Sequence, residues 1–261
     1  MPEVTDPYQP GTPCWIDLMV PDQQAALDFY RDLFGWQGEV GPEEYGGYSV
    51  CTQRGRPVAG IMRAMSAGGA PPPPPTWTTY FASADIGSTE SRVVDEGGAL
   101  LVPPMQVGEL GWMMVGADPQ GAVFGLWQAE GFPGAGIANE HGALLWNQLI
   151  TTDIQGAGEF YRALGLDCEP MPGMPGFTGF QVKGRVIGGV QDMHNMPEGT
   201  PPHWLVHFAV DDVDSTVDAA VRAGGTLRVP ALDLDKVGRL AVLEDPQHAL
   251  FALVAPVGQT A

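Results

Sequence analysis

The sequence contains little positive charge. Only 12 of its 261 residues are lysine or arginine, against 31 aspartates and glutamates, which gives a formal net charge of -19. Proteins that bind nucleic acids or anionic membrane surfaces concentrate basic side chains where they meet the phosphates. We therefore expect neither nucleic acid nor a membrane among the partners of this chain.

Cysteine and long apolar runs are also scarce. Cys14, Cys51 and Cys168 lie far apart and outside any Cys-x-x-Cys pattern, so we expect neither a disulfide framework nor a zinc ribbon. No apolar run reaches the roughly 18 residues that a membrane-spanning helix needs, and the N-terminal residues lack the pattern of a secretion signal. These features predict a cytoplasmic protein. The glycine-rich phosphate loops and the Gly-x-Ser-x-Gly elbow of hydrolases are missing too.

What the sequence does contain is an internal duplication. A shift of 131 residues places Trp15 on Trp146 and residues 29–31 on residues 160–162, both Phe-Tyr-Arg. A shift of 127 residues places the Asp-Pro-Gln of residues 118–120 on that of residues 245–247. Such self-similarity predicts two related domains. We expect a first domain over residues 1–130, a glycine-rich linker over 131–141 and a second domain over 142–261.

Each half divides again into two units. Residues 14–20 alternate like a strand, and Asp22 is a good N-cap for a helix with a buried face over residues 23–35. Residues 47–62 resemble a hairpin, residues 76–85 a second strand, and residues 88–98 a helix that two glycines end. Strands on either side of the Asp-Pro-Gln turn close the half. The pattern predicts an α+β protein with four βαβββ units.

These motifs carry a resemblance to a known family. The helix motifs at residues 28–36 and 159–166, the strands at residues 80–86 and 207–215 and the Asp-Pro-Gln turns resemble the vicinal oxygen chelate superfamily. That superfamily includes glyoxalase I, bleomycin-resistance proteins and extradiol dioxygenases. The resemblance covers nearly the whole chain and implies two curved mixed sheets, each lining a cup. It does not assign a reaction, because the fold serves many functions.

Metal-dependent members of the superfamily place ligands at the start of a first strand and a glutamate on a last strand. Counted from the helix caps, the first-strand positions here hold Trp15, Thr78, Trp146 and Leu205. The positions expected to hold glutamate carry Gly125 and Ala252. Alternate residues on the same strand faces are Asp17, Tyr80, Gln148 and His207. Because a divalent ion needs several nitrogen and oxygen donors, we expect no metal and no other cofactor.

The replacements favour an aromatic pocket, which is typical of a small-molecule site. The residues expected to contact a ligand are Trp15, Asp17, Thr78, Tyr80, Trp112, Gly125, Trp127, Trp146, Gln148, Leu205, His207 and Ala252. We expect a metal-independent binding protein for a planar aromatic molecule, acting in sequestration, self-resistance or biosynthesis. The alternative is an enzyme, either a glyoxalase-type lyase or isomerase or a metal-free hydroxylase-like accessory of aromatic polyketide biosynthesis in which Asp17, Tyr80 or His207 moves protons. The duplication makes a monomer the default, with a dimer left open.

Overall fold

The computed structural model describes residues 8–65, 72–171, 173–174, 177–196 and 199–257. The first half forms β1 (Pro13–Val20), α1 (Gln23–Phe34), the short 3-10 helix η1 (Glu43–Tyr45), β2 (Ser49–Gln53), β3 (Arg56–Arg63), β4 (Thr76–Ala82), α2 (Ile86–Asp95), β5 (Ala99–Val107), β6 (Gly111–Ala117) and β7 (Val123–Ala129). The second half forms β8 (Leu144–Thr151), α3 (Ile154–Ala163), β9 (Asp167–Pro170), β10 (Thr178–Val182), β11 (Arg185–Asp192), η2 (Met193–Asn195), β12 (His203–Ala209), α4 (Val213–Arg222), β13 (Thr226–Leu234), β14 (Gly238–Glu244) and β15 (Leu250–Pro256).

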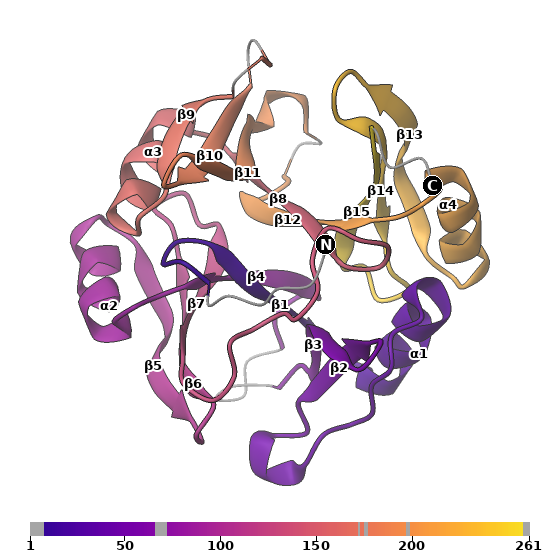
Figure 1. Ribbon diagram of the computed structural model, residues 1–261, viewed down its shortest axis with the longest axis horizontal. Coiled ribbons are helices and arrows are strands. Elements are labelled where there is room, and N and C mark those ends of the chain that lie inside the picture. The colour runs from indigo at the N-terminus through magenta and orange to yellow at the C-terminus, as the bar shows by residue number, and fades with distance from the viewer. Residues whose placement is uncertain (1–7, 66–71, 172, 175–176, 197–198, 258–261) are drawn as a thin grey trace.

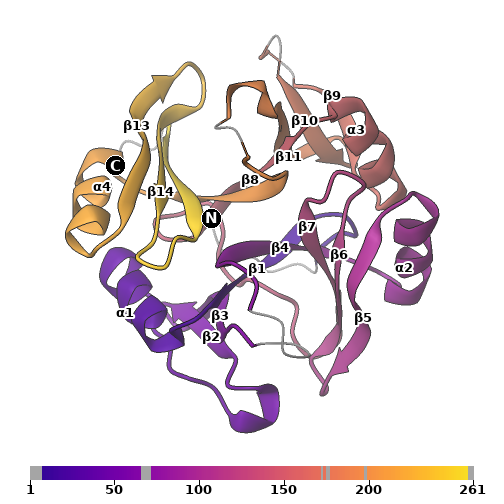
Figure 2. The same ribbon diagram turned by 180° about the vertical axis from the view of Figure 1, so that it is seen from behind.

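Each half contributes one mixed sheet (Figures 1 and 2). The first sheet has seven strands in the order β2-β3-β1-β4-β7-β6-β5, and the second has eight in the order β13-β14-β15-β12-β8-β11-β10-β9. In both sheets the first strand of every unit pairs in parallel with the last strand of the same unit. The predicted fold class, an α+β protein with two mixed sheets and an internal duplication, is confirmed.

The first unit has one strand fewer than the other three. Between α1 and β2 the chain makes only an isolated bridge, Gln37 with Thr52, where the other units place a full strand. The segment contains Gly38, Gly41 and Pro42. Glycine offers no side chain to pack in a strand and proline cannot donate to a sheet, so this stretch is poorly suited to pairing. In this detail the first unit differs from the predicted βαβββ pattern.

All four α-helices begin at an aspartate. The side chains of Asp22, Asp85, Asp153 and Asp212 accept hydrogen bonds of 2.7–3.0 Å from the backbone amide three residues farther along. Such caps satisfy amides that the helix itself leaves unpaired, and each typically stabilises a helix by about 1 kcal/mol. The predicted N-cap at Asp22 is confirmed.

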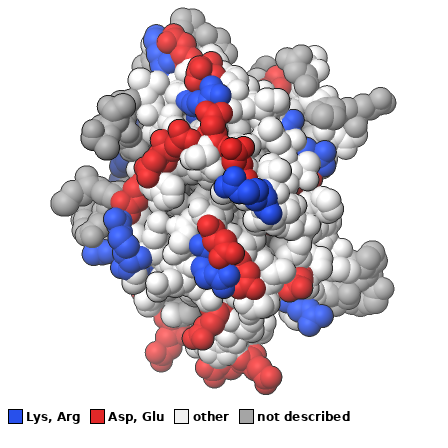
Figure 3. Space-filling model, turned by 90° about the vertical axis from the view of Figure 1, so that its right-hand side faces the viewer, with Lys and Arg blue, Asp and Glu red and all other residues white. Residues whose placement is uncertain are grey.

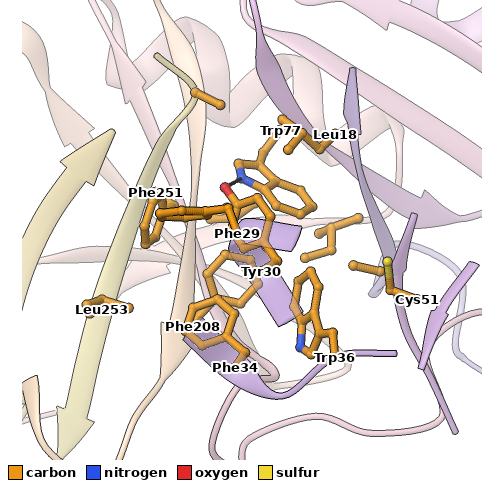
Figure 4. Close-up of a cluster of buried hydrophobic side chains, with 14 of the residues drawn as sticks. Leu18, Phe29, Tyr30, Phe34, Trp36, Cys51, Trp77, Phe208, Phe251 and Leu253 are labelled. Carbon is orange, nitrogen blue, oxygen red and sulfur yellow. Dashed lines mark hydrogen bonds between the residues drawn. The ribbon is translucent and has the colours of Figure 1, made fainter. Parts of the chain in front are cut away.

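The strands pair within each half, but the hydrophobic cores form across the halves. One core joins α1, β1 and β3 to α4, β12 and β15, and the other joins α2 and β7 to α3 and β10. Figures 1 and 2 accordingly show α1 beside α4, and α2 beside α3. Figure 4 shows aromatic rings from both halves packed together in the first core. Separating the halves would therefore expose both cores to water, which is strongly unfavourable.

The motifs that reveal the duplication form matching buried networks between the halves. Trp77 Nε1 donates to the Tyr30 hydroxyl (3.1 Å), which donates to Asp245 Oδ2 (3.2 Å). In the other core, Trp204 Nε1 donates to the Tyr161 hydroxyl (2.8 Å), and that hydroxyl donates to Asp118 Oδ2 (3.3 Å). In both networks the other carboxylate oxygen accepts two backbone amides of its own turn. The Asp-Pro-Gln turns thus fasten each half to a helix of the other half.

Charged residues lie mainly on the outside. Figure 3 shows the face that carries α1 and α4, where aspartate and glutamate side chains form a band with lysine and arginine side chains scattered among them. Over the part of the chain that the structure describes, no helix combines the length and apolar character needed to cross a membrane.

Candidate functional site

Each sheet has one face against the helices and an opposite face that we call its cup. On β1, Ile16 and Leu18 join the core with α1, so Trp15 and Asp17 face the first cup. The first cup is strongly curved. The hydroxyl of Tyr45, the last residue of η1 before the edge strand β2, lies 3.3 Å from the position of a Cβ atom built on Gly108, in the turn after the other edge strand, β5.

Strand register shows which residues share a level in the cups. In each unit, one residue of the first strand lies directly opposite a glycine or alanine of the last, closing strand. This residue is five positions before the aspartate that caps the following helix, and the four such pairs define a shared level in the cups. These pairs are Asp17 with Gly60, Tyr80 with Gly125, Gln148 with Gly189, and His207 with Ala252. The residues that the sequence count assigned to the family's ligand positions, Trp15, Thr78, Trp146 and Leu205, lie two residues nearer the N-terminal ends of the same strands and face the same cups.

Asp17 is a buried carboxyl with few polar neighbours. It is 6% exposed, and the Tyr48 hydroxyl donates to its Oδ2 over 3.4 Å. Burial raises the pKa of the Asp17 carboxyl to about 7, although hydrogen bonds from the Tyr80 and Tyr48 hydroxyls oppose this rise. The Tyr48 hydroxyl in turn accepts a 2.7 Å hydrogen bond from Trp15 Nε1. Asp17 can therefore change its protonation state near neutral pH, inside an aromatic shell.

Side chains fill the space above the closing-strand glycines. A Cβ atom on Gly125 would lie 2.2–2.6 Å from atoms of the Tyr80 ring, and one on Gly60 would lie 1.8 Å from the Tyr48 hydroxyl. A Cβ on Gly189 would lie 2.4 Å from Gln148 Oε1. In three of the four units, a side chain from another strand or loop thus occupies the space that a side chain on the closing strand would fill.

The segment that joins the two halves closes part of the first cup. Residues 130–137, which we call the crossing segment, hydrogen-bond through Ala135 N to Cys14 O and through Gly136 N to Pro57 O. The Phe132 ring packs edge-on against Trp15, with centroids 5.0 Å apart, and Trp127 Nε1 donates to Phe132 O over 2.8 Å. Trp15, Tyr80 and Trp127 are 9% exposed or less. Residues predicted to be linker are thus part of the wall.

The second cup is more open and contains a different titratable group. Trp146 and Gln148 are half-buried, and Trp146 Nε1 donates to Gln148 Oε1 over 3.0 Å. His207 is 6% exposed, and its Nδ1 lies 3.1 Å from the Leu205 carbonyl. Burial lowers the pKa of His207 to about 4. The ring is therefore neutral at pH 7, and with Nδ1 as donor to Leu205 its Nε2 is an acceptor.

The structure divides the predicted site residues between the two cups and places one of them outside both. Strand alternation places Thr78 and Gly125 in the first cup, and Leu205 and Ala252 in the second. Trp112, however, packs against the core between α2 and α3, on the opposite face from its neighbour Met113, which packs in the first cup. Both faces of β6 are apolar, so alternation alone did not show which residue faces the cup.

Three cup residues were not identified from the sequence. Tyr48 precedes the edge strand β2, Phe132 lies in the crossing segment, and the Tyr8 hydroxyl donates to Ala135 O over 2.8 Å. All three come from outside the strands, where periodicity gives no signal. The sequence offered one signal for them, because aromatic side chains are often buried.

The donor set does not fit the metal centre that the family resemblance implies. Within the described residues, no group of three or more His, Cys, Asp or Glu side chains is placed to hold a metal ion. The first cup has Asp17 and Tyr80 at the shared level, the second has Gln148 and His207, and the closing strands supply glycine or alanine. A divalent ion in a protein ordinarily takes at least three protein ligands. Tyr80, Tyr48 and Gln148 also occupy the space a closing-strand glutamate would need.

A family model and several known proteins match this chain. The sequence model of the Glyoxalase/Bleomycin resistance protein/Dioxygenase superfamily matches residues 14–126. The chain is 40% identical over 257 residues to a protein of Mycobacterium tuberculosis (strain CDC 1551 / Oshkosh) named "Putative glyoxylase CFP32", with 97% of each chain covered. It is 36% identical over 261 residues to the anthracycline biosynthesis protein DnrV of Streptomyces peucetius, with 95% of this chain and 94% of that protein covered.

Solved structures agree on the fold. The Mn(II)-bound glyoxalase from Novosphingobium aromaticivorans matches with a TM-score of 0.61 and 15% identity, over 94% of this chain and 82% of that one. The 2,3-dioxygenase LapB from Pseudomonas sp. KL28 matches with a TM-score of 0.59 and 16% identity, over 96% and 95%. At such identities the two structures bear on the fold alone.

Proposed function

The chain belongs to the glyoxalase, bleomycin resistance protein and dioxygenase superfamily, and we propose that it binds a planar aromatic small molecule without a metal ion. Its similarity along nearly the whole length to an anthracycline biosynthesis protein supports a polycyclic ligand and a role beside a biosynthetic route to such compounds. Because the duplication already supplies two sheets and two cups in one chain, we propose that the monomer is the acting form.

The arrangement at the shared strand level carries this proposal. At that level the cups present Asp17, Tyr80, Gln148 and His207 opposite small residues, and neighbouring positions present Trp15, Trp127 and Trp146. Aromatic walls with a few polar anchors are the usual lining of a small-molecule site. Ring stacking adds about 0.5–1.5 kcal/mol per good contact beyond the burial of area. Two such contacts would change the affinity by an order of magnitude or more.

Tryptophan fluorescence provides the test. We expect 1,8-dihydroxyanthraquinone to quench the fluorescence at micromolar concentration, with no effect of adding EDTA. Substituting Trp15→Phe and Trp146→Phe in turn identifies the working cup, because only the variant in that cup loses most of the quenching. Trp112→Phe is the matched control, since Trp112 lies on the other face of its sheet.

The glyoxalase alternative is tested on the same samples. Turnover of the hemithioacetal of glutathione and methylglyoxal, lost with EDTA and restored by Zn²⁺, Ni²⁺ or Mn²⁺, would contradict metal-independent binding. Failure of 1,8-dihydroxyanthraquinone to quench, with or without turnover, would also overturn the proposal.

A further inference from the structure

Asp17 differs from the other buried carboxylates that the structure describes. Asp118 and Asp245 each accept two backbone amides within their turns, and Glu244 pairs with Arg228 over 2.7 Å. These three have structural partners that account for their burial. The groups facing Asp17 are tyrosine hydroxyls within an aromatic cup, which do not offset the cost of burying a charge.

We propose, resting on the proposed binding of a flat aromatic molecule, that Asp17 is the general base of the first cup for a polycyclic aromatic ketone. It would remove a proton from a ring carbon conjugated with the ligand's carbonyl group. Tyr48 is its positioning residue. The second cup has no equivalent base. The counterpart of Asp17 there is Gln148, and the buried titratable group at the same level is His207, opposite Ala252.

The proposed step moves one proton and one electron pair. The Asp17 carboxylate takes the proton from the ring carbon, and the electron pair of the broken C–H bond forms a ring C=C bond. The negative charge passes to the carbonyl oxygen. Once Asp17 is protonated, the Tyr80 hydroxyl no longer has a carboxylate to donate to and can donate to that oxygen instead. Return of the proton, or of one exchanged with water, to carbon reverses the step without any oxidant or reductant.

The local electrostatics suit such a base. A carboxyl whose pKa is about 7 is substantially ionised at neutral pH, yet is a far better proton acceptor than an exposed aspartate. The titratable groups facing it are Tyr48, which precedes β2, and Tyr80 on β4, while β3 presents only Gly60. Cys14, on the same strand as Asp17, is three residues nearer the N-terminus, and its thiol donates to Tyr80 O over 3.4 Å. Burial and the two hydroxyls thus set the pKa of Asp17.

Tyr48 holds the carboxyl in one orientation. Because its hydroxyl accepts from Trp15 Nε1, the hydroxyl proton is left to point at Asp17 Oδ2. The approach requires a glycine at position 60, since a Cβ there would meet the hydroxyl at 1.8 Å. Trp15, Tyr48 and Gly60 therefore form one unit around the proposed base.

Tyr48 also connects the base to the surface. Tyr48 lines a groove of about 520 Å³ with Gln37, Glu39, Val50 and Thr52, between the segment before η1 and the edge strand β2. Ligand pockets typically measure about 300–1,000 Å³, so a tricyclic compound fits the size of the groove. Asp17 does not line the groove itself, but Tyr48, which does, donates to the Asp17 carboxyl, so one residue separates the groove from the proposed base.

Anthrone is a suitable probe, because it is a tricyclic ketone with one acidic methylene group. We expect the wild-type protein, in D2O under argon, to accelerate deuterium exchange at that methylene on the order of 10²-fold or more over buffer, as mass spectrometry measures it. The rate should rise with pH through an inflection near 7. Asp17→Asn should abolish the acceleration, whereas Asp218→Asn, which removes an exposed carboxyl on α4, should leave it unchanged.

Tyr48→Phe distinguishes positioning from packing. The Tyr48 hydrogen bond lowers the pKa of Asp17, so its removal should move the inflection of the exchange rate to higher pH. A rate that falls without any movement of the inflection would leave Tyr48 with a packing role and contradict this part of the proposal.

Anthraquinone, which has no methylene group, separates this proposal from the binding proposal. If anthraquinone quenches the tryptophan fluorescence of wild type and Asp17→Asn alike, the variant is folded and its cup is intact. Exchange by Asp17→Asn at the wild-type rate, or no acceleration by a wild-type protein that binds anthraquinone, would overturn the general base while leaving binding in place. Absence of quenching in the wild type would overturn the binding proposal itself.

Discussion

The two cups come from duplicated sequence and the same strand order, yet they differ in what covers them and in what they bury. The segment joining the halves packs over the first cup, where Phe132 meets Trp15. Trp146, the counterpart of Trp15, remains half-buried. At the same level the first cup buries a carboxyl and the second an imidazole.

The helix-side faces of the sheets, in contrast, have remained alike. The Trp77, Tyr30 and Asp245 network has a matching counterpart in the other core, with the same donors and acceptors. The duplication has therefore kept the side that holds the halves together and varied the cup side, where we propose that a ligand binds. Such a division is expected when one face carries stability and the other carries function.

The largest expected effect is on the pH dependence of the free energy of unfolding, to which the buried groups of the two cups, Asp17 and His207, should contribute with opposite signs. Asp17 has its usual pKa of 3.8 in the unfolded chain and about 7 in the folded one, so the folded protein holds an extra proton between these values. Its contribution to the free energy of unfolding falls as pH rises through this window, by up to about 4 kcal/mol. Because asparagine does not titrate, the free energy of unfolding of Asp17→Asn relative to that of wild type should rise by about 2–3 kcal/mol from pH 5 to pH 8, as urea denaturation measures it.

His207 should show the reverse. Its pKa falls from 6.5 in the unfolded chain to about 4 in the folded protein, so the unfolded chain binds the extra proton between those values. Stability is then lost as pH falls through this window. The free energy of unfolding of His207→Gln relative to that of wild type should rise by about 2–3 kcal/mol as the pH falls from 7 to 4.5. The exposed Asp218→Asn variant should track wild type throughout, and parallel curves for all four proteins would contradict the assignment of these two groups.

The second effect compares one closing-strand glycine from each cup. Gly125→Ala places a Cβ 2.2 Å from a Tyr80 ring atom, and a buried ring has little room to move, so we expect a loss of about 2–3 kcal/mol. Gly189→Ala meets Gln148 Oε1 at 2.4 Å, at the end of a flexible side chain. That amide can rotate, so the expected loss is under about 1 kcal/mol. Urea denaturation of both variants measures the difference, and equal losses would mean that the cups are equally filled.

The sequence predicted the features that local patterns determine. The Asp22 cap, the hairpin of β2 and β3 and the repeat itself each depend on residues close in sequence or on direct comparison of the halves. Alternation along β1 also placed Trp15 and Asp17 on the same face correctly. These parts of the site followed from the two-residue period of a strand.

Other parts required contacts between distant segments. Which residue of β1 lies opposite Gly60 depends on a register set some forty residues later along the chain, so a count from the helix cap cannot determine it. Tyr48, Phe132 and Tyr8 reach the first cup from loops. Loop paths are fixed by the surfaces they cross, and a glycine-rich linker gives no sign of which surface that is.

The smallest effect concerns the helix-side networks, where the halves should respond alike. Tyr30→Phe removes the hydroxyl that links Trp77 to Asp245, and Tyr161→Phe removes the one that links Trp204 to Asp118. Each aspartate keeps two backbone donors on its other oxygen, so neither loses all its partners. We expect each substitution to lower the free energy of unfolding by about 1–2 kcal/mol. Because the networks lie in separate cores, the double variant should lose about the sum. Unequal single losses would show that the helix-side faces have diverged as the cups have, and a double loss far from the sum would show that the two cores are coupled through the sheets.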